Sequence, residues 1–346
     1  ASTQAQTPEA DRFQGIGWLL AYSILFIAFM TLIGKKQERY VLPSVVAIDL
    51  LAGWGWWRLI RGFWRHSWRI PGVKWAVSGL TLAAVLGGQI ACAWTAAPYY
   101  STFYNPLVGG AAQAERLILI GRGEGLEQAA RFIKEHSSEQ APRVASWYGT
   151  SARVLFADLR WPDGRSAEVV DIAHPQTILS SDYVIFYINQ LQRQLPKASI
   201  IRYVVRKRFL HTARLGGINY AYVYGGEAID HPVDPFEEAN RLVGKANLAG
   251  FDMSGAVAAG AKASVRLYWV NDGLQPGEQF YVRLVDDLGR EWGRGDCALD
   301  PAFGDVTAWV DDDIFEVECP MTVLVGAPPG PYLLRAGIMD ENGALI

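Results

Sequence analysis

Long stretches without charge constrain this chain more than any other feature. Residues 15–34 and 75–98 are runs of 20 and 24 residues with no charged side chain. At about 1.5 Å of rise per residue, a helix of about 20 residues crosses the roughly 30 Å hydrocarbon core of a bilayer. A third apolar stretch, residues 41–58, is shorter and contains Asp49. We therefore predict three transmembrane helices within residues 1–100.

Net charge divides the chain at the same place. Residues 1–100 hold nine Lys or Arg and four Asp or Glu, whereas residues 101–346 hold 23 and 31, so the two parts carry +5 and −8. Charged residues make up only 19% of the whole chain. This composition excludes a disordered chain and a basic nucleic-acid binder. It predicts a membrane part followed by an acidic, water-exposed part.

The orientation in the membrane follows from the loops. The loop between the second and third predicted helices holds five cations and no acid, namely Arg58, Arg61, Arg65, Arg69 and Lys74. Loops rich in Lys and Arg stay in the cytoplasm. We therefore expect residues 35–40 and 99–346 to be extracytoplasmic. The sequence begins without Met and ends at a predicted strand, so we expect it to be the C-terminal portion of a longer protein.

A cationic segment opens the second predicted helix at the outer face. It contains Lys35, Lys36, Arg39 and Tyr40. In a helical turn Lys35 and Arg39 are i,i+4 neighbours on one face, and Arg can hold a phosphate through two parallel hydrogen bonds. These residues are candidates for binding a lipid phosphate. The alternative is ordinary snorkelling of long cationic side chains to the headgroups.

Asp49 is a candidate polar site within the membrane. It follows Tyr40 by nine residues, which places it roughly 13 Å deeper in a helix. An acid at that depth faces a bundle interior or water, and such residues are commonly functional. Two alternatives stay open: a structural aspartate that bonds to other helices, and the coupling acid of a transporter.

Residues 101–240 read as an α/β domain. Residues 126–136 show the apolar spacing of an amphipathic helix. Residues 143–148 and 182–188 are typical of strands, the second of them apolar throughout and so buried on both faces. A short helix is expected over 189–195, and a hairpin over 211–224 turns at two consecutive glycines. Strands that alternate with helices predict a sheet covered by helices.

Residues 247–346 read as an all-β sandwich. We expect that this domain can be truncated at the end of the sequence. Short strands separated by Gly, Pro and Asp turns are typical of that fold. Trp269, Tyr281 and Trp292 are candidates for stacking on a sugar ring, with core packing as the alternative. Cys297 and Cys319 are candidates for a disulfide, which requires Cα atoms about 5.5 Å apart.

Two charged runs each have two interpretations, and the histidines indicate no site. The run Arg202, Arg206, Lys207 and Arg208 is either a solvated face or a contact for anionic headgroups. The run of residues 311–313, all Asp, is either an exposed acidic turn or a calcium ligand set. The histidines lack metal-ligand spacing, so we predict no metal site.

Three stretches together carry a family resemblance. They are Lys35-x-x-x-Arg39-Tyr40-x-Leu42-Pro43, Pro98-Tyr99-Tyr100-Ser101-x-x-Tyr104-Asn105-Pro106-Leu107, and Gly121-Arg122-Gly123-Glu124-Gly125-Leu126. In this order they resemble the C-terminal half of bacterial membrane glycosyltransferases of the dolichyl-phosphate-mannose–protein mannosyltransferase type (glycosyltransferase family 39, GT-C class). The resemblance covers most of the chain.

The resemblance implies a multi-pass enzyme of the bacterial cell membrane that moves a sugar from a polyprenyl-phosphate donor to an acceptor glycan, lipid or protein outside the cytoplasm. It implies no cofactor beyond that donor. The family's key acids lie in an N-terminal loop that this sequence lacks, so we predict that the chain alone is inactive. Cations near the donor phosphate would stabilise the charge that develops on it. The alternative is a membrane-anchored extracytoplasmic carbohydrate-binding or interaction module without catalysis.

Overall fold

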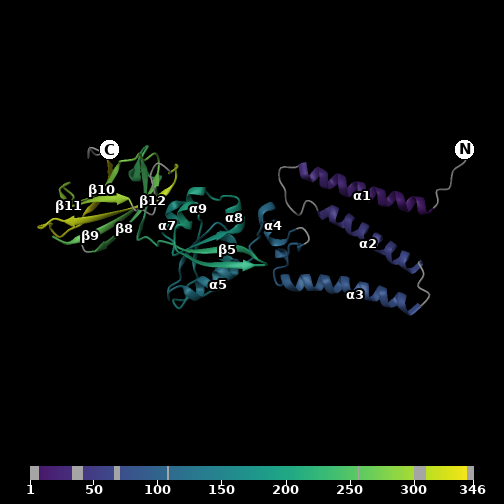
Figure 1. Ribbon diagram of the computed structural model, residues 1–346. Coiled ribbons are helices and arrows are strands. Elements are labelled where there is room, and N and C mark those ends of the chain that lie inside the picture. Colours follow the sequence, from purple (N-terminus) through teal and green to yellow (C-terminus); the bar gives the residue numbers. More distant parts are fainter. Residues whose placement is uncertain are drawn as a thin grey trace. The chain divides into compact units, whose positions relative to one another are not determined.

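The computed structural model describes residues 8–32, 42–65, 71–106, 109–255, 257–299 and 309–340 (Figure 1). The chain divides into two compact units, Ala1–Trp94 and Thr95–Ile346.

The first unit is helical. It contains α1 (Pro8–Leu32), α2 (Leu42–Arg65) and all but the last two residues of α3 (Pro71–Ala96), and α1 contacts α2. Two windows, Gln14–Leu32 in α1 and Trp75–Ala96 in α3, are long and apolar enough to cross a membrane, and only 6% and 0% of them are buried. Apolar helices that are not covered by protein indicate membrane association.

The second predicted span is a helix, but it differs in composition. Asp49, Arg58 and Arg61 lie within α2, which is not among the described helices that are apolar enough to cross a membrane by length and composition alone. The structure therefore supports two of the three predicted membrane spans, and a third span is not supported.

The second unit begins with a mixed α/β sheet. Its strands are β1 (Arg143–Ser146), β2 (Glu168–Val170), β3 (Tyr183–Tyr187), β4 (Phe209–Leu215) and β5 (Ile218–Gly225). Its helices are η2 (Tyr100–Thr102), α4 (Gly110–Leu117), α5 (Leu126–His136), α6 (Gly149–Ala157), α7 (Pro175–Leu179), α8 (Ile188–Gln192) and α9 (Ala198–Val205). The strand order is β2-β1-β3-β5-β4. β1 is parallel to β2 and β3, β5 is antiparallel to β3, and β4 is antiparallel to β5.

Alternation along β3 explains the layers of this part. Val184 and Phe186 pack into one buried cluster together with side chains of α7 and α9. Ile185 and Tyr187 point to the other face and pack with side chains of α5 and α6. Because successive strand residues face opposite sides, an apolar strand such as β3 needs helices on both.

The remaining strands form one antiparallel sheet. They are β6 (His231–Pro232), β7 (Arg241–Leu242), β8 (Ala246–Gly255), β9 (Lys262–Asn271), β10 (Gln279–Val285), β11 (Glu291–Leu299), β12 (Ile314–Val323) and β13 (Leu333–Met339), with η4 (Glu238–Asn240) before β7. The order is β13-β10-β11-β12-β9-β8-β6, and β7 pairs with β8. β10 and β12 approach each other although β11 lies between them, so the sheet curls around its own core. The structure thus replaces the predicted two-sheet sandwich with a single curled sheet.

The predicted basic and acidic runs meet in the structure. Lys197 contacts Asp312 at 2.7 Å, and Arg202 donates two hydrogen bonds to Asp313 Oδ1, the closer at 2.6 Å. α9 is thereby joined to the turn that precedes β12. These contacts engage two of the three aspartates with protein cations.

Candidate functional site

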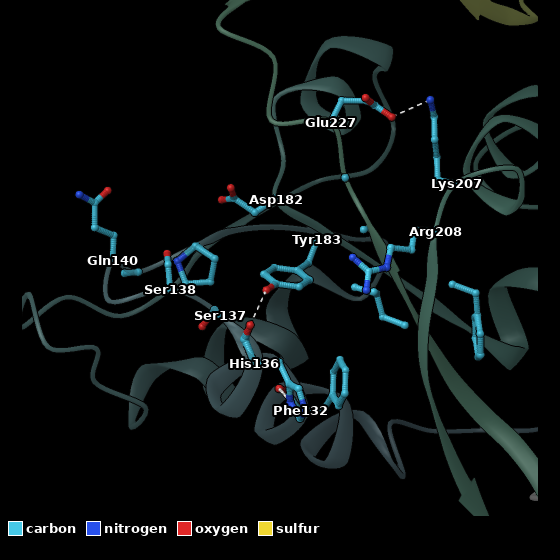
Figure 2. Close-up of a pocket in the computed structure, with 16 residues that line it drawn as sticks. Phe132, His136, Ser137, Ser138, Gln140, Asp182, Tyr183, Lys207, Arg208 and Glu227 are labelled. Atoms are coloured by element: carbon cyan, nitrogen blue, oxygen red, sulfur yellow. Dashed lines mark hydrogen bonds and ion pairs between the residues drawn. The ribbon is translucent and has the colours of Figure 1, made fainter.

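A hollow of about 830 Å³ lies where β1 and β3 begin (Figure 2). Its lining comes from the end of α5, the loop before β1, the start of β3, the start of β4 and the end of β5. The lining residues are Phe132, His136, Ser137, Ser138, Gln140, Ala141, Pro142, Asp182, Tyr183, Lys207, Arg208, Phe209, Leu210, Gly225, Gly226 and Glu227.

Aromatic rings form part of this lining. The Phe132 ring stacks on His136 and on His211, with centroids 4.1 and 4.4 Å apart. Tyr183 donates a hydrogen bond from its hydroxyl to the His136 carbonyl oxygen at 3.3 Å. Phe209 is 54% exposed. The hollow therefore presents apolar ring surfaces to solvent.

Charged groups in the hollow balance one another. Lys207 Nζ lies 2.6 Å from Glu227 Oε1, and Asp182 Oδ2 accepts a hydrogen bond from the backbone N–H of Arg143 at 2.7 Å. The side chains of Arg208 and Gln140 make no hydrogen bond or ion pair with any residue in the described ranges. Figure 2 shows the Arg208 side chain beside Tyr183. Donors and acceptors are thus available beside aromatic faces.

The opposite edge of the sheet, where β1 and β3 end, is organised around Tyr187. The Tyr187 hydroxyl accepts a hydrogen bond from Gly123 N–H at 2.8 Å and donates one to Glu124 Oε2 at 3.0 Å. Gly121 has φ +96°, and a Cβ there would lie 2.6 Å from the Tyr187 ring. A glycine at position 121 is required by both the positive φ and this close approach.

The segment that follows α3 is bonded to the same edge. Ser101 donates to Glu124 Oε1 at 2.5 Å, and the Tyr99 hydroxyl donates to Glu127. The hydroxyls of Tyr104 and Tyr220 lie 3.5 Å apart. The polar groups of this edge are engaged in holding the chain's own segment, which is a structural role.

Glu124 is held in its ionised form. Partial burial alone would raise the pKa of Glu124, but hydrogen bonds from Ser101, the Arg122 amide and Tyr187 together lower that pKa below its ordinary value. Burial also raises the pKa of Tyr187, so this phenol keeps its proton and remains a donor. A carboxylate stabilised in this way is a poor general base, because a base near neutral pH needs a raised pKa.

The structure does not test the residues that were predicted to act at or within the membrane. Lys35, Lys36, Arg39 and Tyr40 lie outside the described residues. Asp49 lies in α2 and is exposed in the first unit. Their predicted roles stay predictions.

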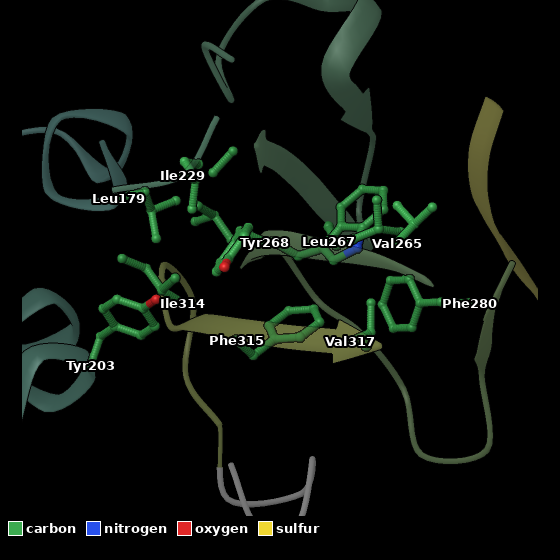
Figure 3. Close-up of a cluster of buried hydrophobic side chains, with 14 of the residues drawn as sticks. Leu179, Tyr203, Ile229, Val265, Leu267, Tyr268, Phe280, Ile314, Phe315 and Val317 are labelled. Carbon is green, nitrogen blue, oxygen red and sulfur yellow. The ribbon is translucent and has the colours of Figure 1, made fainter. Parts of the chain in front are cut away.

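Of the three aromatic residues predicted to stack on sugar, one lies in the core. Trp269 is 1% exposed, and its ring packs against Phe280 at 5.3 Å in the buried cluster of the curled sheet. Figure 3 draws part of this cluster, including Phe280. No face of Trp269 is free for a ligand. Tyr281 and Trp292 are half-buried, so for them sugar stacking stays a prediction.

Both half-buried rings already have protein partners. The Tyr281 ring covers Gly337 on β13, where a Cβ would lie 2.6 Å from the Tyr281 hydroxyl. Trp292 donates from Nε1 to Asp286 Oδ2 at 2.8 Å. That bond, together with hydrogen bonds from Arg290, lowers the pKa of Asp286 to about 2.

Cys297 and Cys319 form a disulfide with Cα atoms 4.1 Å apart. They face each other across β11 and β12, in the register set by Arg294↔Thr322 and Ala298↔Glu318. Directly opposed residues of antiparallel strands come this close at non-hydrogen-bonded pairs. The sequence left this pairing open, because only the strand register brings the two cysteines together.

Sequence reasoning missed most of the hollow. Gln140, Tyr183 and Phe209 come from three separate segments, and none carries a motif. Only Lys207 and Arg208 stood out, as part of the basic run. In the part of the chain that the structure describes, no group of three His, Cys, Asp or Glu side chains could hold a metal ion.

Comparison with known proteins adds no assignment: no family model, no curated protein and no solved structure matches this chain.

Proposed function

We propose that this chain is the C-terminal portion of an integral-membrane glycosyltransferase that uses a polyprenyl-phosphate sugar donor, and that its α/β part binds a saccharide in the hollow. The observation that carries the saccharide assignment is the hollow itself. Sugar rings have apolar faces that stack on aromatic side chains. Their hydroxyl groups need hydrogen-bond donors and acceptors. Phe209 supplies an exposed ring, and Arg208 and Gln140 supply polar groups without partners among the described residues.

The charge balance of the hollow supports a neutral polyhydroxylated ligand. Asp182 and Glu227 offset Lys207 and Arg208, so neither an anion nor a cation is favoured by net charge. Because Lys207 is engaged by Glu227, the accessible donor is the Arg208 guanidinium, which presents several N–H groups in one plane. A saccharide hydroxyl can use both this donor and the neighbouring carboxylates as partners.

The disulfide supports an extracytoplasmic location for the second unit. Disulfides persist in oxidising compartments and are rare in the cytosol. The five-cation loop between α2 and α3 points to the same orientation. In this proposal all three helices cross the membrane, and α2, the least apolar, is held by neighbouring helices of the complete enzyme. Lys35 and Arg39 then bind the donor phosphate at the outer face.

The first experiment tests the hollow by titrating the purified chain with methyl mannoside and related glycosides, in a detergent that has no sugar headgroup. We expect Arg208→Ala to weaken binding about tenfold, which is about 1.4 kcal/mol. Arg294→Ala is the matched control, because Arg294 is an exposed cation on β11 outside the hollow. Equal affinity of the Arg208→Ala variant and the unchanged chain would contradict the assignment.

A second experiment tests catalysis in the protein that includes the upstream sequence. Lys35→Ala and Arg39→Ala should abolish sugar transfer from a polyprenyl-phosphate donor and leave glycoside binding in the hollow unchanged. Normal transfer by both variants would contradict the phosphate-binding role. The variants thus separate donor binding from saccharide binding.

A second candidate function is a membrane-anchored saccharide-binding module without catalysis. The state of Glu124 favours it, because three hydrogen bonds keep this carboxylate ionised rather than ready to accept a proton. Glycoside binding without transfer, measured in the protein with its upstream sequence, would establish this second function in place of the first.

A further inference from the structure

An apolar surface lies on the second unit close in sequence to the end of α3. Its members, which we call the apolar patch, are Tyr100, Phe103, Leu117, Ile118 and Leu119, and they are 65%, 41%, 70%, 41% and 54% exposed. Single exposed apolar residues are ordinary, but several large ones at one edge of a domain mark a contact surface.

The backbone around Leu117–Leu119, the second half of the patch, is fixed by hydrogen bonds to Gln192. Gln192 on α8 donates through Nε2 to the carbonyl oxygens of Glu115 and Ile118, at 2.9 and 3.0 Å, and accepts from Ile120 N–H at 2.9 Å. Ile120 is only 1% exposed. Because Ile120 and Gln192 anchor this turn to the domain, the three preceding side chains are presented outward.

The two halves of the patch belong to one edge of the α/β sheet. Ser101, between Tyr100 and Phe103, donates to Glu124. Glu124 follows Leu119 by five residues and is itself bonded to Tyr187, the last residue of β3. Both halves therefore lie at the edge where β1 and β3 end.

Chain length ties this edge to the membrane. Ala96 is the last residue of the window in α3 that is long and apolar enough to cross a bilayer. A chain extends by at most about 3.5 Å per residue, so Tyr100 lies within about 14 Å of Ala96 and Phe103 within about 25 Å. The headgroup region adds about 5–8 Å beyond the hydrocarbon core on each side. A tether this short lets the edge where β1 and β3 end reach the bilayer surface.

We propose that the apolar patch rests in the outer headgroup layer of the bilayer. Apolar and aromatic side chains insert at this level, and cations beside them contact lipid phosphates. Arg116 and Arg122 are exposed and flank Leu117–Leu119 in the sequence. The occupant is the lipid surface, and a second protein is the alternative that the experiment below separates. The proposal does not depend on the glycosyltransferase assignment.

The test uses the full chain with Cys92→Ala, so that a single new cysteine carries a nitroxide label while the Cys297–Cys319 disulfide stays intact. Leu119→Cys reports on the patch. Leu288→Cys is the matched control, because Leu288 is a 71% exposed leucine in the turn between β10 and β11. The labelled proteins are placed in vesicles of phosphatidylcholine and phosphatidylglycerol, and collisions with oxygen and with a water-soluble nickel complex are measured.

We expect the label at position 119 to collide several times more often with oxygen than with nickel, relative to the label at 288, because oxygen concentrates in lipid. Equal behaviour at the two positions would overturn the proposal. Protection of position 119 from both reagents would also overturn it, since that pattern means that protein covers the patch.

Discussion

The two edges of the α/β sheet differ in what their polar groups do. In parallel α/β folds, ligands commonly bind outside the carboxyl ends of the strands, where the strand order reverses. Here β2 and β3 flank β1, so that position lies beside Tyr187, yet Glu124 and Tyr187 are bonded to the chain's own segment after α3. At the amino edge, Arg208 and Gln140 face a hollow without such partners among the described residues. The protein's own segment occupies one edge, whereas Arg208 and Gln140 at the other edge stay exposed.

The largest expected effect concerns the carboxyl edge. Tyr187 is fully buried, and Tyr187→Ala should lower the free energy of unfolding by about 3–5 kcal/mol, as truncation of a buried aromatic does. Thermal unfolding followed by near-ultraviolet circular dichroism measures this. Glycoside affinity, measured where the variant is still folded, should be unchanged. Loss of affinity in the folded variant would break the distinction between the edges.

An intermediate effect concerns charge at the same edge. Glu124→Gln should cost about 1–2 kcal/mol, because the hydrogen bonds it accepts are made to a charged group. The pKa of Glu124 is lowered in the folded state, so its contribution is present above pH 4.5, its ordinary value, and is lost as the pH falls through the lowered pKa. The variant should therefore lose less stability than the unchanged chain on acidification.

The control for that measurement is Glu139→Gln, at an exposed glutamate in the loop before β1. It should leave both the stability and its pH dependence within about 0.5 kcal/mol of the unchanged chain. If both variants respond alike to acid, Glu124 has no special part in holding the segment.

The smallest expected effect concerns the amino edge. Phe209→Ala removes an exposed ring, so stability should change by less than about 1 kcal/mol. Glycoside affinity should fall by about 0.5–1 kcal/mol, or roughly two- to fivefold, through lost stacking. Calorimetric titration measures it, with Leu288→Ala as the exposed apolar control. An unchanged affinity would show that the ring is not part of the site.

Local patterns in the sequence predicted several of the α/β elements, although not β2, α6 or α9. The helix expected over residues 126–136 is α5, and the strand expected over 182–188 contains β3. The hairpin turns at Gly216 and Gly217, whose φ angles of 55° and 89° suit a two-residue hairpin turn. Each of these signals depends on residues close together in the chain.

Long-range pairing escaped the same reasoning. Short strands were expected in the C-terminal region, but nothing in their alternation distinguishes two packed sheets from one curled sheet, because both bury every second side chain. The disulfide and the hollow depend in the same way on register, since Cys297 meets Cys319, and Tyr183 meets Arg208, only after distant segments pair. The sequence therefore predicted elements, and their assembly decided the site.

Lys207 connects two parts of the second unit that look separable in sequence. Its ammonium group contacts Glu227 in the hollow and Glu316 on β12, and Tyr203 donates to Glu316 at 2.9 Å. Expressing the α/β part alone would deprive Lys207 of one counter-ion and bare the α9 face that packs on β12. The α/β part and the antiparallel sheet should therefore be expressed and crystallised together.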